Sequence, residues 1–320
     1  MNSTDFVKAY APATVANVCC GFDVLGFALD QPGDEVWVRK TEAQGITISA
    51  IHGIEGLSAN PAENVIGVVA QKMLEALEVP HGLEMQLHKG MPVGSGLGSS
   101  AASSAAAAYA VNELLGSPFS TKELVVFAME GERKASGSAH ADNVAPSLLG
   151  GFVLVRDYEP LDVVELGVPL ELYCTVLYPQ IELKTSLSRQ ILKQEIPLKQ
   201  GIRQWGNLAG LMAGLLKKDY ALLGRSLHDA IFEPERSILI PLFKQVKSAA
   251  LAAGALGAGI SGSGPSIFAL SATRAQALAV QEAMEAIYSG SGIETKSYVA
   301  QVPEQGVRLV GHSSYKPAQL

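Results

Sequence analysis

The chain has 320 residues, with 24 Lys and Arg against 31 Asp and Glu, which gives a formal net charge of −7. Hydrophobic residues make up 48% and charged residues 17% of the sequence, a composition typical of a compact globular protein and not of a disordered or collagen-like chain. This acidic balance, without a long block of like charges, argues against a nucleic-acid-binding surface or a polybasic membrane patch.

The number of cysteines and the length of the apolar runs indicate in which cellular compartment the protein is expected. Cys19, Cys20 and Cys174 are an odd set, which is poor material for a disulfide framework or a zinc site. Residues 1–10 lack the apolar stretch of a signal peptide, and the longest apolar run, 249–260, is shorter than the roughly 20 residues of a membrane span. We therefore expect a soluble cytoplasmic protein that binds neither nucleic acid nor membrane.

In the first part of the chain, alternating hydrophobic residues predict strands at 36–38, 46–48, 83–87 and 151–155. Asn60, Pro61 and Glu63 form a helix-start signature ahead of apolar residues on one face, so we expect a helix that begins at Asn60. Residues 101–115 are rich in alanine, and residues 120–123 repeat the capping signature. Both segments predict helices.

In the second part, runs at 172–178, 266–270 and 296–302 predict strands, and helices are expected near 208–216, from Pro241 and after Thr273. Strands come in pairs before helices, which favours an α+β architecture over a doubly wound parallel sheet. Residues 156–170 contain Pro160, Gly167 and Pro169 and are expected to join two halves. We therefore expect domains at 1–160 and 161–320, with a final segment that packs back on the first.

The most informative stretch is residues 92–102. Gly94, Gly96 and Gly98 lack the Cβ atoms that would keep a ligand away from the backbone, and an Ala-rich helix follows at Ser99 and Ser100. Such a loop directs backbone N–H groups and the positive end of a helix dipole at one anion. It predicts a nucleotide-phosphate site, although it has neither the Gly-Lys-Ser/Thr ending of a Walker loop nor the third glycine of a dinucleotide fingerprint.

Two other interpretations of this stretch stay open. The glycines could serve only to pack a tight strand-to-helix turn against its neighbours. Alternatively, Ser100 could be the nucleophile of a serine hydrolase, supported by His140 and by Asp142 two residues later.

Two further stretches are rich in small residues. Residues 257–262 match G-x-G-x-x-G formally, but they follow a helix and precede a strand, the reverse of a dinucleotide site. We expect a backbone loop that closes over a substrate or phosphate. Residues 11–23 predict a turn that carries Asn17 and Asp23. Cys19 and Cys20 in this turn are interpreted as small buried residues, because no adjacent cation would lower their pKa.

Together, residues 11–23, 92–102 and 257–266 resemble the three signature motifs of the GHMP kinases, a family that includes galactokinases, homoserine kinases and mevalonate kinases. Residues 17–23, 140–146 and 233–236 resemble the members that phosphorylate homoserine. The resemblance implies two α+β domains, the first like ribosomal protein S5 domain 2 and the second ferredoxin-like, usually in a homodimer. It also implies ATP, Mg²⁺ and phosphorylation of the L-homoserine hydroxyl in threonine biosynthesis.

The resemblance assigns residues to each ligand. It implies nucleotide contacts from Asn64, Lys89, Pro92, Val93, Gly94, Ser95, Gly96, Leu97, Gly98, Ser99, Ser100, Ala101 and Ala102. It implies Mg²⁺ binding by Ser100 and Glu132, with Glu130 as a competing candidate. It implies acceptor contacts from Asn17, Asp23, His140, Asp142, Asn143, Thr185, Arg189, Arg236 and Gly262.

Homoserine carries an ammonium, a carboxylate and a hydroxyl, so a selective site needs buried carboxylates and bidentate arginines. Asp23 or Asp142 and Arg236 or Arg189 supply them, and we expect Asp142, Arg189 and Glu132 to act in catalysis. Asp142 is a candidate base, but a carboxylate bound to the ammonium is a poor one. The alternatives are another small-molecule GHMP kinase, acting on mevalonate or a sugar, and a nucleotide-binding pseudokinase.

Overall fold

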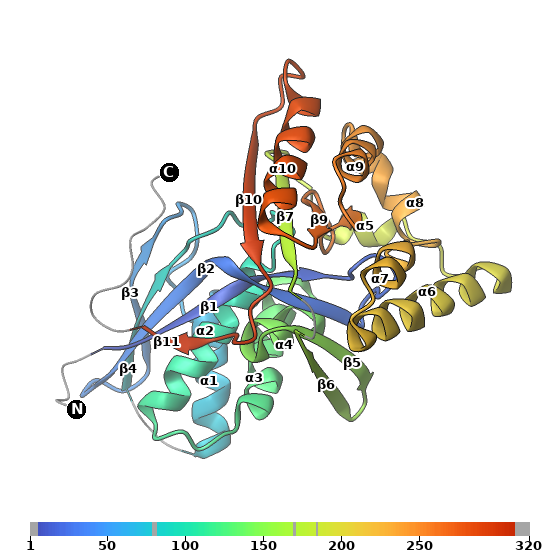
Figure 1. The fold of residues 1–320 in the computed structure, drawn as a ribbon. Coiled ribbons are helices and arrows are strands. Elements are labelled where there is room, and N and C mark those ends of the chain that lie inside the picture. Colours follow the sequence, from blue (N-terminus) through green and yellow to red (C-terminus); the bar gives the residue numbers. More distant parts are fainter. Residues whose placement is uncertain (1–5, 79–81, 169–170, 184, 311–320) are drawn as a thin grey trace.

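A computed structural model describes residues 6–78, 82–168, 171–183 and 185–310. The chain forms two sheets, each covered by helices (Figure 1), so the α+β architecture expected from the sequence is confirmed. A buried hydrophobic cluster reaches from Val7 and Phe27 in the first half to Phe268 and Val302 in the second. The two halves therefore share part of their core.

The first sheet is seven-stranded, with the order β11-β1-β2-β4-β3, and β5 pairs with both β2 and β6. Its strands are β1 (Val7–Ala16), β2 (Leu25–Thr41), β3 (Ile46–His52), β4 (Gly82–His88), β5 (Phe152–Tyr158), β6 (Leu161–Gly167) and β11 (Arg308–Leu309). All pairs are antiparallel except β3 with β4. The long β2 forms the centre, since it pairs with β1, β4 and β5.

Four helices cover one face of this sheet (Figure 1): α1 (Val65–Leu77), α2 (Ser99–Leu114), α3 (Thr121–Ser136) and α4 (Ala141–Leu149). The Ala-rich α2 packs against β1 and β2 because its small side chains let the backbones approach. At α3, Ser120 and Glu123 form the capping box that the sequence predicted. The start expected at Asn60 for α1 is wrong: the Asn60 carbonyl closes a turn with the N–H of Asn64, and Asn64 is the N-cap.

The second sheet has the order β10-β7-β9-β8 and is antiparallel throughout. Its strands are β7 (Tyr173–Pro179), β8 (Gly257–Ile260), β9 (Ile267–Ser271) and β10 (Thr295–Gln301). The helices of this half are α5 (Thr185–Gln190), α6 (Leu198–Lys217), α7 (Tyr220–Ser226), α8 (Glu233–Arg236), α9 (Phe243–Ala252) and α10 (Arg274–Tyr288). Helices α9 and α10 pack on the sheet, and α6 projects away from it with α7 alongside (Figure 1).

Several elements differ from the sequence expectations. The segment expected to join the halves is mostly the hairpin of β5 and β6 in the first sheet, and Leu170 at its end lies outside the described residues. The chain later returns to that sheet, because β11 pairs with β1. The G-x-G-x-x-G stretch begins as strand β8 and continues through a turn into β9.

Among the described residues, no helix has the length and apolar character to span a membrane.

Candidate active site

The loop before α2 has the conformation that its glycines permit. Gly94, Gly96 and Gly98 have φ values of 72°, 82° and 65°, in the left-handed region that side chains with a Cβ rarely adopt. Gly98 is the N-cap of α2 and supplies no side-chain cap. The N–H groups of the first turn of α2 are therefore available to an anionic ligand.

The packing interpretation also holds, but for only two of these glycines. A Cβ at Gly96 would lie 2.7 Å from the carbonyl oxygen of Ser261, and one at Gly98 would lie 2.2 Å from Oγ1 of Thr14. A Cβ at Gly94 would meet nothing within 4 Å. Gly96 and Gly98 thus hold the loop against its neighbours, whereas Gly94 faces open space.

The three glycine-rich or small-residue stretches meet at this loop. The Ser261 hydroxyl donates to the carbonyl of Gly96 at 2.6 Å. The amide of Asn17 donates to the carbonyl of Gly262 at 2.7 Å. The backbone N–H of Thr14 donates to the carbonyl of Leu97 at 3.0 Å. Segments far apart in sequence therefore form one site.

Lys89 and Asn64 are already engaged by the protein. The buried Lys89 ammonium pairs with Asp34 and donates to the Ser99 hydroxyl and the Ser103 hydroxyl. These hydrogen bonds connect Lys89 to the first turn of α2, so its ammonium is occupied by the protein itself. Asn64 caps α1 by accepting the N–H of Ile66, and its amide donates to the carbonyl of Ser58, so within the described residues it serves the start of α1.

Glu132 on α3 is a buried carboxylate with one oxygen unsatisfied. Its Oε1 has no hydrogen-bond partner among the described residues. Burial raises the pKa of Glu132, and the Ser100 hydroxyl nearby lowers it in part. Glu130, the competing candidate, instead forms an ion pair with Arg133 at 3.3 Å. A hydroxyl and a carboxylate oxygen are ligands that Mg²⁺ accepts alongside phosphate oxygens.

On the acceptor side, Asp23 and Arg189 face each other. The Arg189 guanidinium donates to both oxygens of Asp23 at 2.9 and 3.0 Å, and to Nε2 of His140 at 2.9 Å. Burial is the largest cause of the lowered pKa of His140, which favours the neutral ring that accepts this bond. The two groups expected to contact opposite charges of an amino acid thus form an ion pair with each other.

Arg236 on α8 is buried, with 5% of its surface exposed. Its Nε donates to the carbonyl of Ser188 at 3.1 Å, and Nη1 donates to the carbonyl of Gly262 at 3.2 Å. The guanidinium lies 4.8 Å from the ring centroid of Phe22. Burial lowers the pKa of Arg236 to about 10, and the Arg189 charge adds to this shift, so the group still carries its charge near neutral pH.

Asp142 lies in the first turn of α4 and is 3% exposed. Burial raises its pKa to about 8, and the charges of Asp23 and Glu132 contribute in the same direction. Asp142 therefore feels the charges of both Glu132 and Asp23. The next residue, Asn143, accepts the Thr14 hydroxyl at 2.7 Å.

The remaining predicted acceptor residues lie along the turn between β8 and β9. The Thr185 hydroxyl is 3.2 Å from that of Ser263, and Gly262 accepts from Asn17 and Arg236. Sequence reasoning missed Asp34, Thr14, Phe22, Ser261 and Ser263. Asp34 carries no signal in the sequence, whereas Ser261 stands inside the G-x-G-x-x-G stretch at 257–262 and Ser263 directly follows it.

The hydrolase interpretation finds no support in the described residues. No histidine there bonds to Ser100, and His140 is held by Arg189. The dinucleotide interpretation is excluded by topology, because β8 and β9 form an antiparallel hairpin without a following helix at the turn. Among the described residues, no group of three or more His, Cys, Asp or Glu is placed to hold a metal ion.

Comparison with known proteins gives a consistent result. The sequence matches the families "GHMP kinases N terminal domain" over residues 64–151 and "GHMP kinases C terminal" over residues 211–290. It is 49% identical over 316 residues to the homoserine kinase of Chloroherpeton thalassium, covering 95% of this chain and 99% of that protein.

Solved structures agree. The crystal structure of homoserine kinase from Cytophaga hutchinsonii matches with a TM-score of 0.94 and 52% identity, covering 97% of this chain and 99% of that one. Mevalonate kinase of L. major, at 19% identity and a TM-score of 0.72, covers 92% of this chain and 96% of that one. This second likeness shows a shared fold.

Proposed function

Because this chain belongs to the GHMP kinase family, we propose that it transfers the terminal phosphoryl group of ATP to the side-chain hydroxyl of L-homoserine. The observation that carries the proposal is a set of charges beside the phosphate loop, with Asp142 and Arg236 buried and Asp23 and Arg189 half-buried. Asp23 and Asp142 provide carboxylates for an ammonium and a hydroxyl, and Arg189 and Arg236 provide guanidinium groups for a carboxylate. O-phosphohomoserine is the product, on the route to threonine.

Mg²⁺ fits the pair of Ser100 and Glu132. The buried, unpartnered Oε1 of Glu132 next to a hydroxyl is a donor set that lacks only a cation. When bound with ATP, Mg²⁺ neutralises charge on the phosphate oxygens. The protein adds the N–H groups of the loop, which bind the phosphates and align them for in-line transfer.

At the acceptor side we propose an exchange of partners. The homoserine ammonium takes the place of Arg189 on Asp23, and the freed Arg189 joins Arg236 on the homoserine carboxylate. One internal ion pair is thus replaced by two pairs with the ligand. Selectivity follows, because an acceptor that lacks either charge leaves a buried group without its partner.

Asp142 then remains for the hydroxyl. The Asp23 and Glu132 charges raise the pKa of Asp142, and in the complex that we propose the nearby ammonium and cation lower it. Ionised Asp142 accepts a hydrogen bond from the hydroxyl and takes its proton as the phosphoryl group arrives. Oligomeric state stays a prediction from the family resemblance, which implies a homodimer.

A steady-state assay that couples ADP release to a colour change tests the substrate. L-homoserine should be turned over, whereas mevalonate and galactose, which lack an ammonium, should give at most about 1% of its kcat/KM. Faster turnover of mevalonate or galactose would favour a different GHMP kinase activity. Tight ATP binding without turnover of any acceptor would favour a pseudokinase.

A further inference from the structure

A second cavity lies apart from the phosphate loop, between the start of α6, the segment before α8, and α9. Its volume is about 830 Å³, within the range of sites that bind small molecules. Figure 1 shows these helices on the side of the second half where α6 projects. None of the residues that we assigned to ATP or homoserine lines it.

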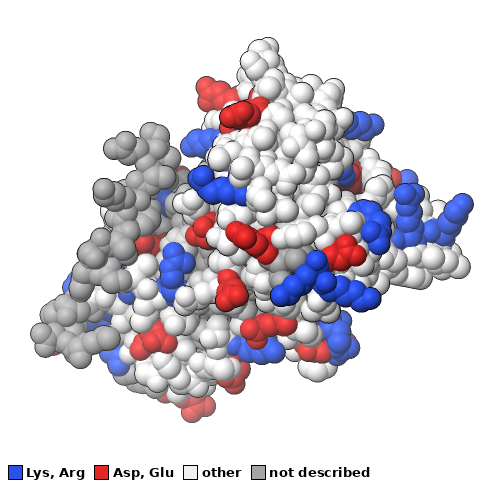
Figure 2. Space-filling view, in the orientation of Figure 1, with Lys and Arg blue, Asp and Glu red and all other residues white. Residues whose placement is uncertain are grey.

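The cavity is basic although the chain as a whole is acidic. Lys199, Arg203, Lys244 and Lys247 line it, against Asp229 and Glu233. In Figure 2, Lys and Arg side chains gather over α6 and its neighbours at the right of the view. Positive charge is therefore concentrated at this face of a protein with a net charge of −7.

Both acidic groups have partners in the protein, although Oε2 of Glu233 has no hydrogen bond among the described residues. Lys247 donates to Oε1 of Glu233 at 2.5 Å. The Asp229 carboxylate accepts the backbone N–H groups of Ile231, Phe232 and Glu233 at 2.8–3.0 Å. Within the described part of the chain, Lys199, Arg203 and Lys244 have no ion pair, so three cations of the lining lack a counter-charge.

The rest of the lining includes apolar carbon. Phe243, Leu251 and Pro234 contribute to the wall, and Leu251 leaves 45% of its surface exposed. Three unpaired cations beside an apolar wall suit a ligand with several negative charges on a carbon body. An inorganic anion alone would leave the apolar wall in water.

We propose that this cavity binds a small organic polyanion, a phosphate ester or a polycarboxylate, and that its occupancy weakens homoserine binding. The link is α8. Glu233 is its first residue and Arg236 its last, while Asp229 fixes the segment before it. An anion that draws Lys247 away from Glu233 removes the counter-charge that holds this short helix, and Arg236 shifts with it. The second half of this inference rests on the proposed function, and the first half does not.

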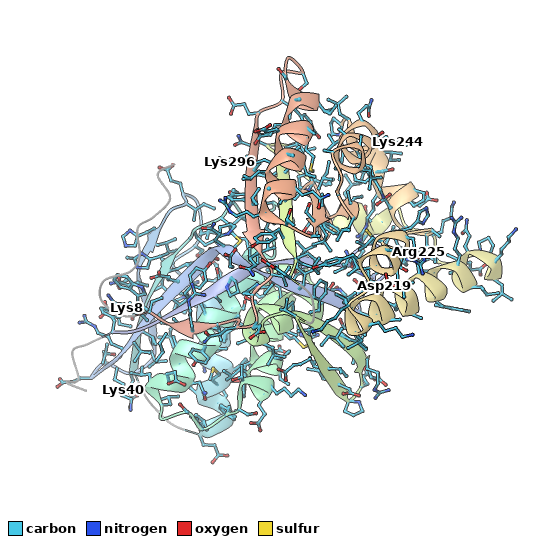
Figure 3. The ribbon with its side chains drawn as sticks, in the orientation of Figure 1. Lys8, Lys40, Asp219, Arg225, Lys244 and Lys296 are labelled. Atoms are coloured by element: carbon cyan, nitrogen blue, oxygen red, sulfur yellow. The ribbon has the colours of Figure 1, made fainter. Side chains whose placement is uncertain are left out.

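Isothermal titration calorimetry tests the binding, with fructose 1,6-bisphosphate and citrate as probes for the phosphate-ester and carboxylate sources. The cavity variant is Arg203→Gln/Lys244→Gln. The matched control is Arg225→Gln/Lys296→Gln, which removes one arginine and one lysine outside the cavity; Figure 3 shows Lys244 on α9 and Lys296 on β10. Any bisphosphate that binds at the phosphate loop is measured in the cavity variant and subtracted.

We expect the parent and the control to differ from the cavity variant in their binding of at least one probe. They should bind one additional molecule of that probe, or bind it with a Kd at least about tenfold lower. The probe that shows this difference identifies the ligand class. Equal binding of both probes by all three proteins would overturn the site, and this readout does not depend on activity.

The coupling is tested by the KM for homoserine at saturating ATP and constant free Mg²⁺. Saturating probe should raise that KM several-fold in the parent and the control and leave it unchanged in the cavity variant. Binding without any change in KM would overturn the coupling. Absence of all phosphoryl transfer in the parent would instead contradict the proposed function, with the calorimetric result intact.

Discussion

The nucleotide side and the acceptor side of the site are built in different ways. The first is one continuous stretch, residues 92–102, whose shape is fixed by positive φ angles and by backbone contacts with Ser261 and Thr14. The second collects Asp23, Arg189 and Arg236 from separate segments, and its charges bond to one another or to backbone. The nucleotide side is thus held by backbone contacts within the protein, whereas we propose that the acceptor side exchanges partners when ligand binds.

This difference predicts different penalties. On the nucleotide side, a substitution changes the volume or the charge at one position of the loop. It should alter nucleotide binding or rate without altering acceptor selectivity. On the exchanging side a substitution changes which ion pairs form, so it should alter selectivity as well as rate. Glu132 and Asp142 lie where the two sides meet.

The largest effect is expected at Glu132. Glu132→Gln keeps the shape of the side chain but removes the charge that we propose for Mg²⁺, so kcat should fall by about 10² or more, or roughly 2.7 kcal/mol of transition-state stabilisation. Glu130→Gln is the matched control, because Glu130 pairs with Arg133 and should matter little. Steady-state kinetics with Mg²⁺ titration measures both, and a reversed order of the two effects would place the metal ligand at Glu130.

The next effect is expected at Arg236. Its Nε and Nη1 bond to backbone carbonyls, and Nη2 has no hydrogen bond within the described chain, so it remains free for a carboxylate. Arg236→Lys should lower kcat/KM for homoserine at least about tenfold, and Arg236→Leu further, since charge-assisted contacts contribute about 1.5 to 3 kcal/mol.

The acceptor 3-aminopropanol, which lacks the carboxylate, provides the control. It should be a poor substrate for the parent and nearly insensitive to either substitution. Parent-like kinetics of Arg236→Leu on homoserine would remove the carboxylate role.

A smaller effect is expected on the nucleotide side. Gly94→Ala places a Cβ in open space at φ 72°, where the phosphates approach, so the KM for ATP should rise about tenfold. Gly116→Ala is matched in strain, with φ 88° and no atom within 4 Å of the new Cβ, but it lies at the other end of α2. We expect both variants to lose a similar amount in Tm, and only Gly94→Ala to change the KM for ATP. Equal KM values would mean that the phosphates do not pass Gly94.

A separate prediction concerns stability and pH instead of catalysis. Asp142 has a folded pKa of about 8, above its ordinary value near 3.8, so the folded state holds a proton that the unfolded state releases. Its contribution to stability is full below about pH 4 and is lost as the pH rises toward and through 8, at a limit of about 1.4 kcal/mol per pH unit.

In Asp142→Asn the side chain cannot ionise, so unfolding releases no proton from it. The Tm of this variant should therefore exceed that of the parent by an amount that grows between pH 5 and pH 8. Thermal unfolding at a series of pH values measures the difference. A constant difference across this range would show that Asp142 is ionised throughout.

The fold was predictable where pattern or capping signals were strong. Alternation in β3 and β4 and the capping residues Ser120 and Thr273 marked real elements. The strands β1 and β8 were not recognised in full, because fully buried strands of small residues show no alternation. Helix α4 was missed because Pro146 lies inside it.

The site divides in the same way. The phosphate loop could be predicted from contiguous glycines, because local backbone conformation determines it. The pairing of Arg189 with Asp23 could not, since nothing in the sequence fixes the distance between residues so far apart. The double role of the glycines, with Gly94 open and Gly96 and Gly98 packed, also depends on contacts from other segments.

Phosphorus-31 NMR of a reaction that contains the protein, ATP, Mg²⁺ and L-homoserine tests the central claim most directly. Transfer to the homoserine hydroxyl predicts one phosphomonoester signal that grows in step with ADP, is coupled to the side-chain CH₂ protons, and grows at least about a hundredfold more slowly in Glu132→Gln. Inorganic phosphate as the only new product, or a phosphoryl group attached to the carboxylate, would contradict it.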